Sequence, residues 1–388
     1  MEIYSKHPGD ELKTGSSNPQ NTGVRISGEE AGGPIVSVII PVYNKVDAIK
    51  QCLQSVVMNQ SLEKSKYEVI IIDDGSTDGS EKVCDQIECE NVRVFHQENK
   101  GVSYARNRGI NLAQGSYVCF VDSDDTIENE YLERMLEHID DADLVMCTYY
   151  LDRKENAEFL YSIDKVIHFN DIDKEDKTKL FFNTQLYTQC NKLFNIDVIR
   201  RNSLYFDETI KYAEDGIFSY QYLSFCNSLF YIHEPLYHYR MEYSTALQKK
   251  YDNVWRYIIA FSDKKLNFLY KKIGQQEHLL AGEIAFHDWE RILQHYFLRK
   301  QDSSTRDCLQ KAYEWYYPYF VDFIPFIKIS AIFDEGMISQ YKEYLANGSL
   351  AAIERRLWII KEKQAILYTS KRCRNLIRAF LQKAKNWV

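Results

Sequence analysis

Buried strands alternate with amphipathic helices between residues 34 and 150. Val36 to Val42 and Val69 to Ile72 are continuous apolar runs rich in β-branched residues, typical of strands covered on both faces. Shorter apolar runs at residues 92–95 and 117–121 predict two further strands. Apolar residues at helical spacing separate these runs, so the pattern predicts an α/β fold with a mostly parallel sheet flanked by helices.

The rest of the chain has different patterns. Residues 1–33 are rich in Gly, Ser, Pro, Asn and charge without an apolar period, which predicts a disordered polar leader. Residues 34–245 form the predicted α/β domain. Beyond them strand signals fade and helical spacing dominates, so residues 246–388 are predicted to be a helical accessory domain. At residues 371–388, apolar positions at helical spacing alternate with Lys and Arg, which predicts a basic amphipathic helix.

Charge is spread unevenly along the chain. The net charge is −8, but residues 351–388 hold ten Lys or Arg and two Glu, so they carry +8 and the remainder carries −16. A basic tail on an acidic body predicts an anionic surface partner for the tail, and peripheral membrane contact is one such partner. Docking onto the acidic body, or dimer formation, is the alternative. We expect no nucleic-acid partner.

The cysteine and hydropathy patterns bear on the compartment. Nine scattered cysteines include no CxxC pair, so neither a thiolate metal site nor a disulfide framework is predicted, and a reducing cytoplasm fits best. No segment has 18 uninterrupted apolar residues, so no spanning helix is predicted. The predicted location is the cytoplasm, at the inner face of the cell membrane if the basic tail binds lipid.

Acidic residues follow the second and fourth predicted strands. Asp73 and Asp74 end one strand, and Asp122 and Asp124 follow the other. Ligands bind outside the carboxyl ends of parallel strands, and hard cations prefer carboxylate oxygens. Asp122 and Asp124 therefore predict a site for Mn²⁺ or Mg²⁺, and Asp73 or Asp74 can accept from a nucleotide base or ribose. A polar turn is the alternative for Asp122 and Asp124, and a turn with a helix cap is the alternative for Asp73 and Asp74.

An aromatic residue and an arginine lie near the same predicted sheet edge. Tyr43, which follows Pro41 on the first strand, can stack on a base, although plain packing is the alternative. Arg106 stands at a predicted helix start, and its guanidinium suits phosphate because it donates bidentate hydrogen bonds. The alternative for Arg106 is a solvated surface charge.

Two polar groups later in the chain are further candidates. Glu214 and Asp215 open an amphipathic helix, where Asp215 can act as a general base for a hydroxyl group. Stabilisation of the helix dipole is the alternative for this pair. His238 is a candidate metal ligand and Arg240 a candidate phosphate contact, with a structural role as the alternative.

Taken in order, six segments resemble the inverting family 2 glycosyltransferases with the GT-A fold. The resemblance spans residues 36 to about 245, and any one motif is weak while six in order are specific. The matching segments are VSVIIPVYN (36–44), VIIIDDGSTDGS (69–80), NKGVSYARNRGI (99–110), GSYVCFVDSDD (115–125), NKLF (191–194) and AEDGIFSYQYL (213–223).

The resemblance implies a function and its partners. It implies an enzyme of the hexosyltransferase type, dependent on Mn²⁺ or Mg²⁺, that inverts the anomeric carbon. The implied donor is a nucleotide-diphosphate sugar, typically of UDP, and the implied acceptor is a hydroxyl group of a glycan or a lipid-linked molecule. Synthesis of bacterial surface polysaccharide or another glycoconjugate is the implied process.

The resemblance also implies a role for each matching residue. Asp215 is the implied base, and Glu214 contacts the acceptor. Asp122 and Asp124 form the DxD metal motif, with Asp124 the more direct ligand and Asp122 also on the donor side. The remaining implied contacts are Pro41, Tyr43, Asp73 or Asp74 and Arg106 for the nucleotide, with His238 and Arg240 for metal or diphosphate.

Two other functions stay open. A non-catalytic nucleotide-sugar or glycan-binding scaffold would have a degenerate site, against which the presence of Asp122, Asp124 and Asp215 argues. A sugar-nucleotide pyrophosphorylase shares the architecture, but it would need a Gly-rich basic loop where residues 41–44 read Pro-Val-Tyr-Asn.

Overall fold

The computed structural model describes residues 33–151, 157, 159–240, 254–297, 303–328, 335–353 and 355–356. The predicted basic helix at 371–388 and the first 32 residues of the predicted leader lie outside these parts of the chain. Both therefore stay predictions, as does membrane contact through the tail.

Nine strands within the described residues form one sheet, in the order β3-β2-β1-β4-β8-β6-β9-β5, with β7 paired to β9. The strands are β1 (Val36–Val42), β2 (Tyr67–Asp73), β3 (Val92–His96), β4 (Tyr117–Phe120), β5 (Thr126–Ile127), β6 (Val145–Leu151), β7 (Lys165–His168), β8 (Lys192–Asn195) and β9 (Ser228–Tyr239). The four apolar runs predicted as strands correspond to β1, β2, β3 and β4, which confirms the α/β fold class.

The order of the strands brings the carboxyl ends of three parallel strands to one edge of the sheet. β1 pairs in parallel with β2 on one side and with β4 on the other, and β2 pairs in parallel with β3. The registers Val42↔Asp73 and Ile39↔Phe120 bring the carboxyl ends of β1, β2 and β4 to the same edge. The chain builds outward from β1 in both directions, so this edge is a topological switch point, where α/β proteins bind ligands.

The other half of the sheet is mixed. β6 and β9 are parallel, whereas β8 pairs antiparallel with β4 and β6, and β5 and β7 pair antiparallel with β9. The 12-residue β9 spans this half, because it contacts β5, β6 and β7 along its length. Its carboxyl end lies beside the Asp122 loop, since Thr126 of β5 pairs with His238 of β9.

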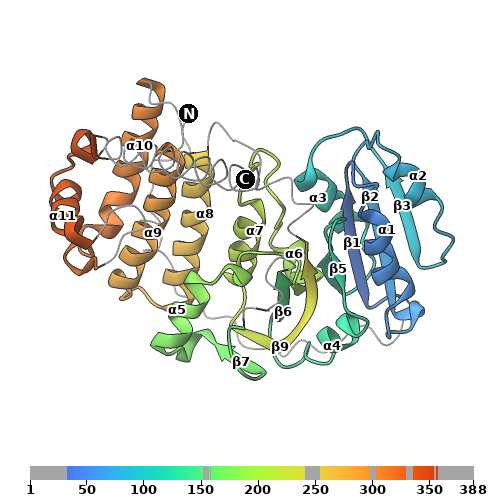
Figure 1. The fold of residues 1–388 in the computed structure, drawn as a ribbon. Coiled ribbons are helices and arrows are strands. Elements are labelled where there is room, and N and C mark those ends of the chain that lie inside the picture. Colours follow the sequence, from blue (N-terminus) through green and yellow to red (C-terminus); the bar gives the residue numbers. More distant parts are fainter. Residues whose placement is uncertain are drawn as a thin grey trace, which may run out of the picture. The chain divides into compact units, whose positions relative to one another are not determined.

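Helices cover both faces of the parallel half (Figure 1). Alternate residues of β1 and β2 pack against α1 and α2 on one face, and the other residues of β2 pack against α3 and α6. The helices of this part are α1 (Ile49–Leu53), α2 (Ser80–Asp85), α3 (Val102–Leu112), α4 (Tyr131–Leu136), α5 (Lys174–Phe182), α6 (Ile196–Arg201) and α7 (Glu214–Leu223), with shorter turns η1 (Gln54–Met58), η2 (Lys64–Lys66), η3 (Phe169–Asp171) and η4 (Thr184–Leu186).

The chain divides into two compact units. One comprises the described residues up to 240 together with Ala260–Glu277, and the other comprises Val254–Ile259 and the described residues from His278 onwards. The division at residues 245 and 246 stays a proposal. The later part of the chain is helical, as predicted, with α8 (Val254–Phe268), η7 (Leu269–Ile273), α9 (His278–Phe297), α10 (Ser303–Phe320), η8 (Ile324–Phe326), η9 (Glu335–Met337) and α11 (Ile338–Ala346).

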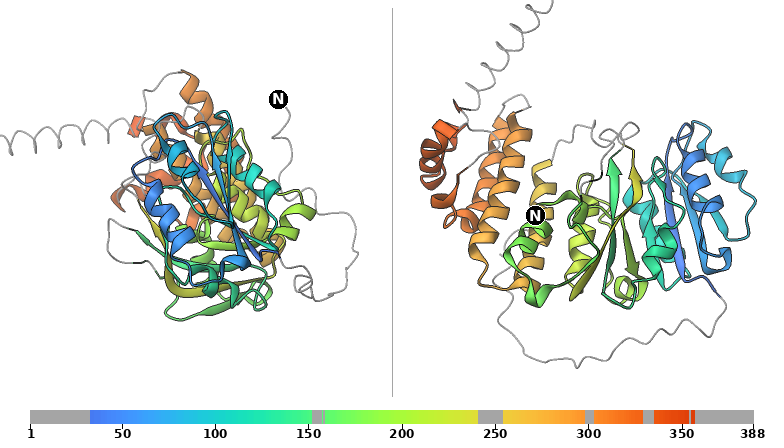
Figure 2. Two further views of the ribbon diagram at one scale, coloured as in Figure 1. Left: turned by 90° about the vertical axis from the view of Figure 1, so that its right-hand side faces the viewer. Right: turned by 60° about the horizontal axis from the view of Figure 1, so that its bottom comes forward.

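Within the second unit, α9 and α10 lie side by side (Figure 2). Trp289 of α9 is fully buried against the aromatic rings of Tyr313, Tyr316 and Phe320 on α10. The high aromatic content therefore contributes to this core. Among the described residues, no helix is both long and apolar enough to cross a membrane.

Candidate active site

Three aspartates follow β4 and each has a partner from another part of the chain. Asp122 Oδ1 accepts a 2.8 Å hydrogen bond from Arg106 Nη2, and Asp124 Oδ2 forms an ion pair with Lys45 Nζ. Asp125 is buried and accepts from the hydroxyl of Tyr237 at 2.6 Å. Burial and the crowding of these carboxylates raise the pKa of Asp124 and of Asp125. The loop is therefore a concentrated negative charge that Lys45 and Arg106 partly offset.

A buried hydrogen-bond network fixes the shape of this loop. The Tyr237 hydroxyl accepts from the N–H of Asp122 at 3.2 Å while it donates to Asp125. The other oxygen of Asp125 accepts from the N–H of Arg240 at 2.8 Å. The end of β9 is thus joined to the loop that follows β4, which holds Asp122 and Asp124 at the switch point.

Arg106 is the central cation of the site. It lies on α3, is 4% exposed, and its guanidinium sits 5.2 Å from the ring centroid of Phe206. Besides the bond to Asp122, its Nη1 lies 3.5 Å from Glu214 Oε1. Burial acts to lower the pKa of Arg106, but the carboxylates of Asp122 and Glu214 outweigh burial and raise it. The Nε of Arg106 is buried and has no hydrogen-bond partner among the described residues.

The start of α7 brings Glu214 and Asp215 to the same place. Ala213, which precedes the helix, has a left-handed backbone with φ of 62°, a conformation that costs energy for a residue with a Cβ. Asp215 is half-buried, and burial together with the neighbouring Glu214 raises its pKa to about 7. Arg106 acts in the opposite direction and Asp122 adds a smaller upward effect. The structure therefore places Asp215 within electrostatic reach of Arg106 and Asp122.

The predicted nucleotide residues lie at the ends of β1 and β2. Pro41 is buried in β1, and Tyr43 beyond it is 48% exposed. Asp73 accepts from the N–H of Ser76 at 3.1 Å and pairs with His96 Nδ1 at 2.9 Å. The hydrogen bond in which the carboxylate of Asp73 accepts from the His96 ring is the main cause of a raised pKa for His96.

Asp74 accepts hydrogen bonds that hold the loop before α3 in place. One oxygen accepts from Gln97 Nε2 at 2.7 Å and from the N–H of Lys100 at 2.9 Å, and the other accepts from the N–H of Gly101 at 2.8 Å. Gly101 directly precedes α3, so Asp74 fixes the loop that leads into the helix that carries Arg106. Nucleotide contact by Asp73 or Asp74 stays a prediction.

His238 and Arg240 have partners of their own. His238 Nε2 lies 2.6 Å from Glu128 Oε1, and its ring stacks on Tyr150 at 4.9 Å. Arg240 Nη1 donates to Gln51 Oε1 on α1. Within the described residues there is no group of three or more His, Cys, Asp or Glu that could hold a metal ion. The structure thus does not join His238 to Asp122 and Asp124 as a ligand set, and its role as a ligand stays a prediction.

Asp122 and Asp124 fit a divalent cation whose remaining ligands come from the substrate and water. Mg²⁺ and similar ions are commonly held by one or two carboxylates, with substrate phosphates and water completing the shell. Asp122 and Asp124 stand two residues apart, and both are partly exposed at the switch point. The donor set is therefore compatible with a metal that binds together with a diphosphate.

Four residues of this site were missed by sequence reasoning. Three of them lie inside or next to the matching motifs, namely Lys45, Asp125 and Lys192. The fourth, Tyr237, lies on β9. Asp125 was visible as the last residue of DSDD. Lys45 and Tyr237 pair with residues 79 or more positions away. Lys192 donates to two backbone carbonyls and to the side chain of Asn191, so single-sequence patterns give no signal for these contacts.

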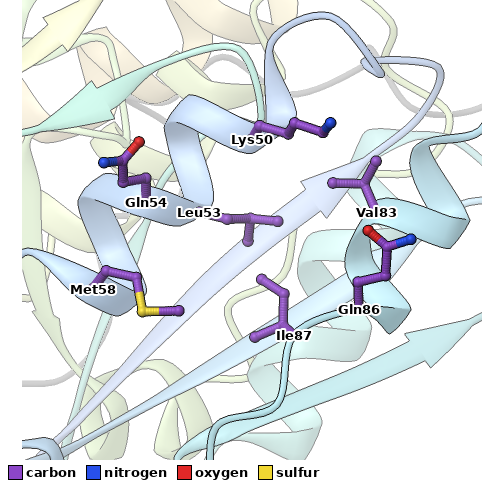
Figure 3. Close-up of a pocket in the computed structure, with 7 residues that line it drawn as sticks. All are labelled: Lys50, Leu53, Gln54, Met58, Val83, Gln86 and Ile87. Carbon is purple, nitrogen blue, oxygen red and sulfur yellow. The ribbon is translucent and has the colours of Figure 1, made fainter.

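A cavity of about 330 Å³ lies elsewhere, between the α1–η1 segment and α2 (Figure 3). Leu53, Met58, Val83 and Ile87 supply its apolar wall. None of the candidate site residues lines it, so it is separate from the carboxylates described above.

Known proteins with related sequences support the assignment of the family. The model of the family described as "Glycosyl transferase family 2" matches residues 37–202. EpsH of Bacillus subtilis (strain 168) is 33% identical over 251 residues, which are 63% of this chain and 72% of EpsH. The minor teichoic acid biosynthesis protein GgaA of the same organism is 27% identical over 325 residues, which are 80% of this chain and 70% of GgaA.

A solved structure supports the fold. The crystal structure of residues 1–349 of TarS from S. aureus, in complex with UDP-GlcNAc, is similar with a TM-score of 0.66 and 18% identity. The similarity covers 85% of this chain and 91% of that one. It confirms the predicted GT-A class of fold. With the sequence relatives, these findings show that the chain is a glycosyltransferase and belongs to glycosyl transferase family 2.

Proposed function

We propose that this protein transfers a hexosyl group from a nucleotide-diphosphate sugar, with UDP the expected nucleotide, to an acceptor hydroxyl with inversion. One observation carries the proposal. Arg106 contacts Asp122, a proposed metal ligand on the donor side, and Glu214, which is next to the proposed base. One buried cation therefore joins the proposed donor side of the site to its proposed acceptor side. A binding scaffold would not require a carboxylate with a pKa near 7 at this junction.

Asp215 is the proposed general base. A pKa of about 7 means that the carboxylate is available at neutral pH and is still basic enough to accept a proton. In a single displacement, the acceptor oxygen bonds to the anomeric carbon as the bond from that carbon to the phosphate oxygen breaks. The acceptor proton moves to Asp215, and the nucleoside diphosphate leaves. One base and no covalent intermediate give inversion.

Asp122 and Asp124 would hold the divalent cation, Mn²⁺ or Mg²⁺. When bound, such a cation offsets the negative charge that gathers on the leaving diphosphate. Arg106 and Lys45 hold these two carboxylates in place from α3 and from the loop after β1. The network of Tyr237 and Asp125 keeps the loop backbone in the same position.

The nucleotide contacts and the acceptor class are also part of the proposal. Tyr43 is exposed where it can stack on a base, and the ends of β1 and β2 around Pro41 and Asp73 would form the pocket wall, with Arg240 close to the diphosphate. Because GgaA takes part in teichoic acid synthesis and TarS binds UDP-GlcNAc, we propose a UDP-sugar donor and a cell-surface glycan or lipid-linked acceptor. The eight cysteines among the described residues are free, in keeping with the proposed cytoplasmic location.

A donor panel tests the proposal. The full chain is incubated with UDP-, GDP- and other nucleotide sugars, with Mn²⁺, Mg²⁺ or EDTA, and release of the free nucleoside diphosphate is measured. We expect release from one nucleotide class, with loss in EDTA and a fall of roughly 10²–10⁴-fold in Asp215→Asn. Asp197→Asn, which changes an exposed aspartate on α6, is the matched control and should keep full activity. Donor binding without release in every condition would favour the scaffold.

A further inference from the structure

Lys192 is a fully buried cation whose role the proposed mechanism leaves unexplained. It begins β8, in the segment NKLF, and is 0% exposed. Its Nζ donates to the carbonyl oxygens of Gln185, at 2.7 Å, and Thr188, and to Asn191 Oδ1 at 2.8 Å. All three acceptors are uncharged. A buried ammonium group without an ion-pair partner is expensive, so its presence calls for a physical reason.

The charged group that acts on Lys192 is Asp215. Burial lowers the pKa of Lys192 to about 7, while Cys190, Cys147 and Asp215 oppose that change. Burial raises the pKa of both cysteines well above neutral, so both are uncharged thiols at pH 7. Asp215 is therefore the one ionised group of the three. Electrostatic interaction is mutual, so the ammonium group of Lys192 favours the ionised form of Asp215.

The segment that Lys192 holds packs against the helix that carries Asp215. Ser219 of α7 donates to the carbonyl oxygens of Tyr187 and Thr188, both at 3.3 Å. Ser219 lies four residues after Asp215, so the two side chains share one face of the helix. Thr188 O therefore receives both Lys192 Nζ and Ser219 Oγ, and it links the buried cation to α7.

We propose that Lys192 is a positioning residue for Asp215: its Nζ holds residues 185–191 through their carbonyl oxygens, and Thr188 of this segment also accepts from Ser219 on the helix that carries Asp215. This inference rests on the proposed role of Asp215 as the base. Glu214 on its own helix and Asp122 from the end of β4 raise the pKa of Asp215, and Arg106 from α3 lowers it. Asp215 in turn raises the pKa of Lys192, so Lys192 also favours the ionised form of Asp215. Two carboxylates thus oppose its ionisation and two cations favour it.

Kinetics over a pH range test the proposal. Lys192→Met keeps the length of the side chain but removes its charge and its donors. We expect the acidic limb of the kcat profile to move to higher pH, and kcat at pH 7 to fall on the order of 10- to 100-fold with an unchanged KM for the donor. Lys272→Met, which removes a partly buried lysine that donates to Asn227, is the matched control and should leave the profile in place. A profile of Lys192→Met that superimposes on the parent would overturn the proposal.

A second measurement does not depend on turnover. The free energy of unfolding is measured from pH 5 to 8 for the parent, Lys192→Met, Asp215→Asn and the double variant. We expect the coupling between the two positions to be largest near pH 7, where both side chains carry charge, and to be lost at pH 5, where Asp215 is protonated. Equal coupling at both pH values would contradict a charge effect. If the two positions are coupled but the protein releases no nucleotide from any donor, the interaction of Lys192 with Asp215 is upheld and the proposed function is wrong. Failure of this inference can therefore be distinguished from failure of the proposed function.

Ser219→Ala tests the positioning element if Lys192→Met does not fold. This variant loses one hydroxyl group and no charge. We expect a lower kcat with the pH profile unmoved, because the segment is loosened while Lys192 remains. An unchanged kcat would remove the positioning part of the proposal.

Discussion

Arg106 on α3 donates a 2.8 Å hydrogen bond to Asp122 at the end of β4, and the same guanidinium faces Glu214 at the start of α7. Asp122 and Glu214 stand 92 residues apart in the chain. A buried cation therefore sets the spacing between the proposed metal ligands and the proposed base. The predictions below follow from this arrangement.

Arg106→Met should lower both stability and activity. The substitution leaves Asp122 and Glu214 without their shared partner, which costs about 1.5–3 kcal/mol in the free energy of unfolding. Because Arg106 holds the pKa of Asp215 down, its loss should also move the acidic limb of the kcat profile to higher pH. Urea unfolding and kinetics over a pH range measure the two effects.

Arg108→Met is the matched control for that experiment. Arg108 lies on the same helix and donates to His96 O and Gln97 Oε1, away from the carboxylates. It should change stability by no more than about 0.5 kcal/mol and leave the pH profile in place. Equal effects of the two substitutions would remove the special role of Arg106.

Asp215→Asn should inactivate the protein and stabilise it above neutral pH. The folded-state pKa of Asp215 is raised to about 7 from its ordinary value of 3.8, so the folded state binds the proton more tightly than the unfolded chain. Stability is then fully present below pH 4 and is lost as pH rises through 7. Thermal unfolding should show a higher Tm for the variant at pH 8 and little difference at pH 4. A lower Tm at pH 8 would mean that Asp215 stabilises the fold.

A divalent cation should stabilise the protein most strongly together with a nucleoside diphosphate. Ligand at 100 times its Kd adds about 2.7 kcal/mol to the folded state. We expect Mn²⁺ with UDP to raise the Tm of the parent, and Asp124→Asn to abolish most of this increase. Asp78→Asn alters an aspartate that binds the backbone of Val46 and Ser80, so it should keep the response to ligand. The same shift in Asp124→Asn and the parent would place the ion elsewhere.

Tyr237→Phe should loosen the loop after β4. Without its hydroxyl, the buried carboxylate of Asp125 loses a 2.6 Å donor and the N–H of Asp122 loses its acceptor. We expect a loss of about 1–3 kcal/mol in the free energy of unfolding and weaker binding of metal with nucleotide. Calorimetry measures both quantities. Tyr205→Phe, at an exposed tyrosine that contacts Asn111, should change neither.

Much of the fold was predictable because β1 and β2 are covered on both faces. Their apolar runs and the polar residues that end them are local signals, and they correctly placed the switch point. β9 was not predicted. It mixes polar and apolar residues, contains Pro235, and pairs with β6 through register shifts near Thr148, all of which hide the period of a strand.

The candidate site was predictable in its carboxylates and in Arg106, but not in Lys45 or Lys192. Asp122, Asp124 and Asp215 lie in matching motifs, whereas Lys45 pairs with Asp124, 79 residues away. His238 could be chosen from chemistry alone, but its neighbour Glu128 could not, because the two are 110 residues apart. Long-range pairing is therefore what single-sequence reasoning lacked.

The pairing of Asp124 with Lys45 and of Asp122 with Arg106 also affects how the donor would be admitted. Lys45 and Arg106 are the counterions of these aspartates, so an incoming metal ion must compete with two cationic side chains of the protein. A diphosphate that binds with the metal gives these two side chains another anion to neutralise. Metal binding therefore requires Asp122 and Asp124 to exchange Arg106 and Lys45 for the cation. This exchange disfavours the binding of metal without nucleotide, so the nucleotide and the ion should bind cooperatively.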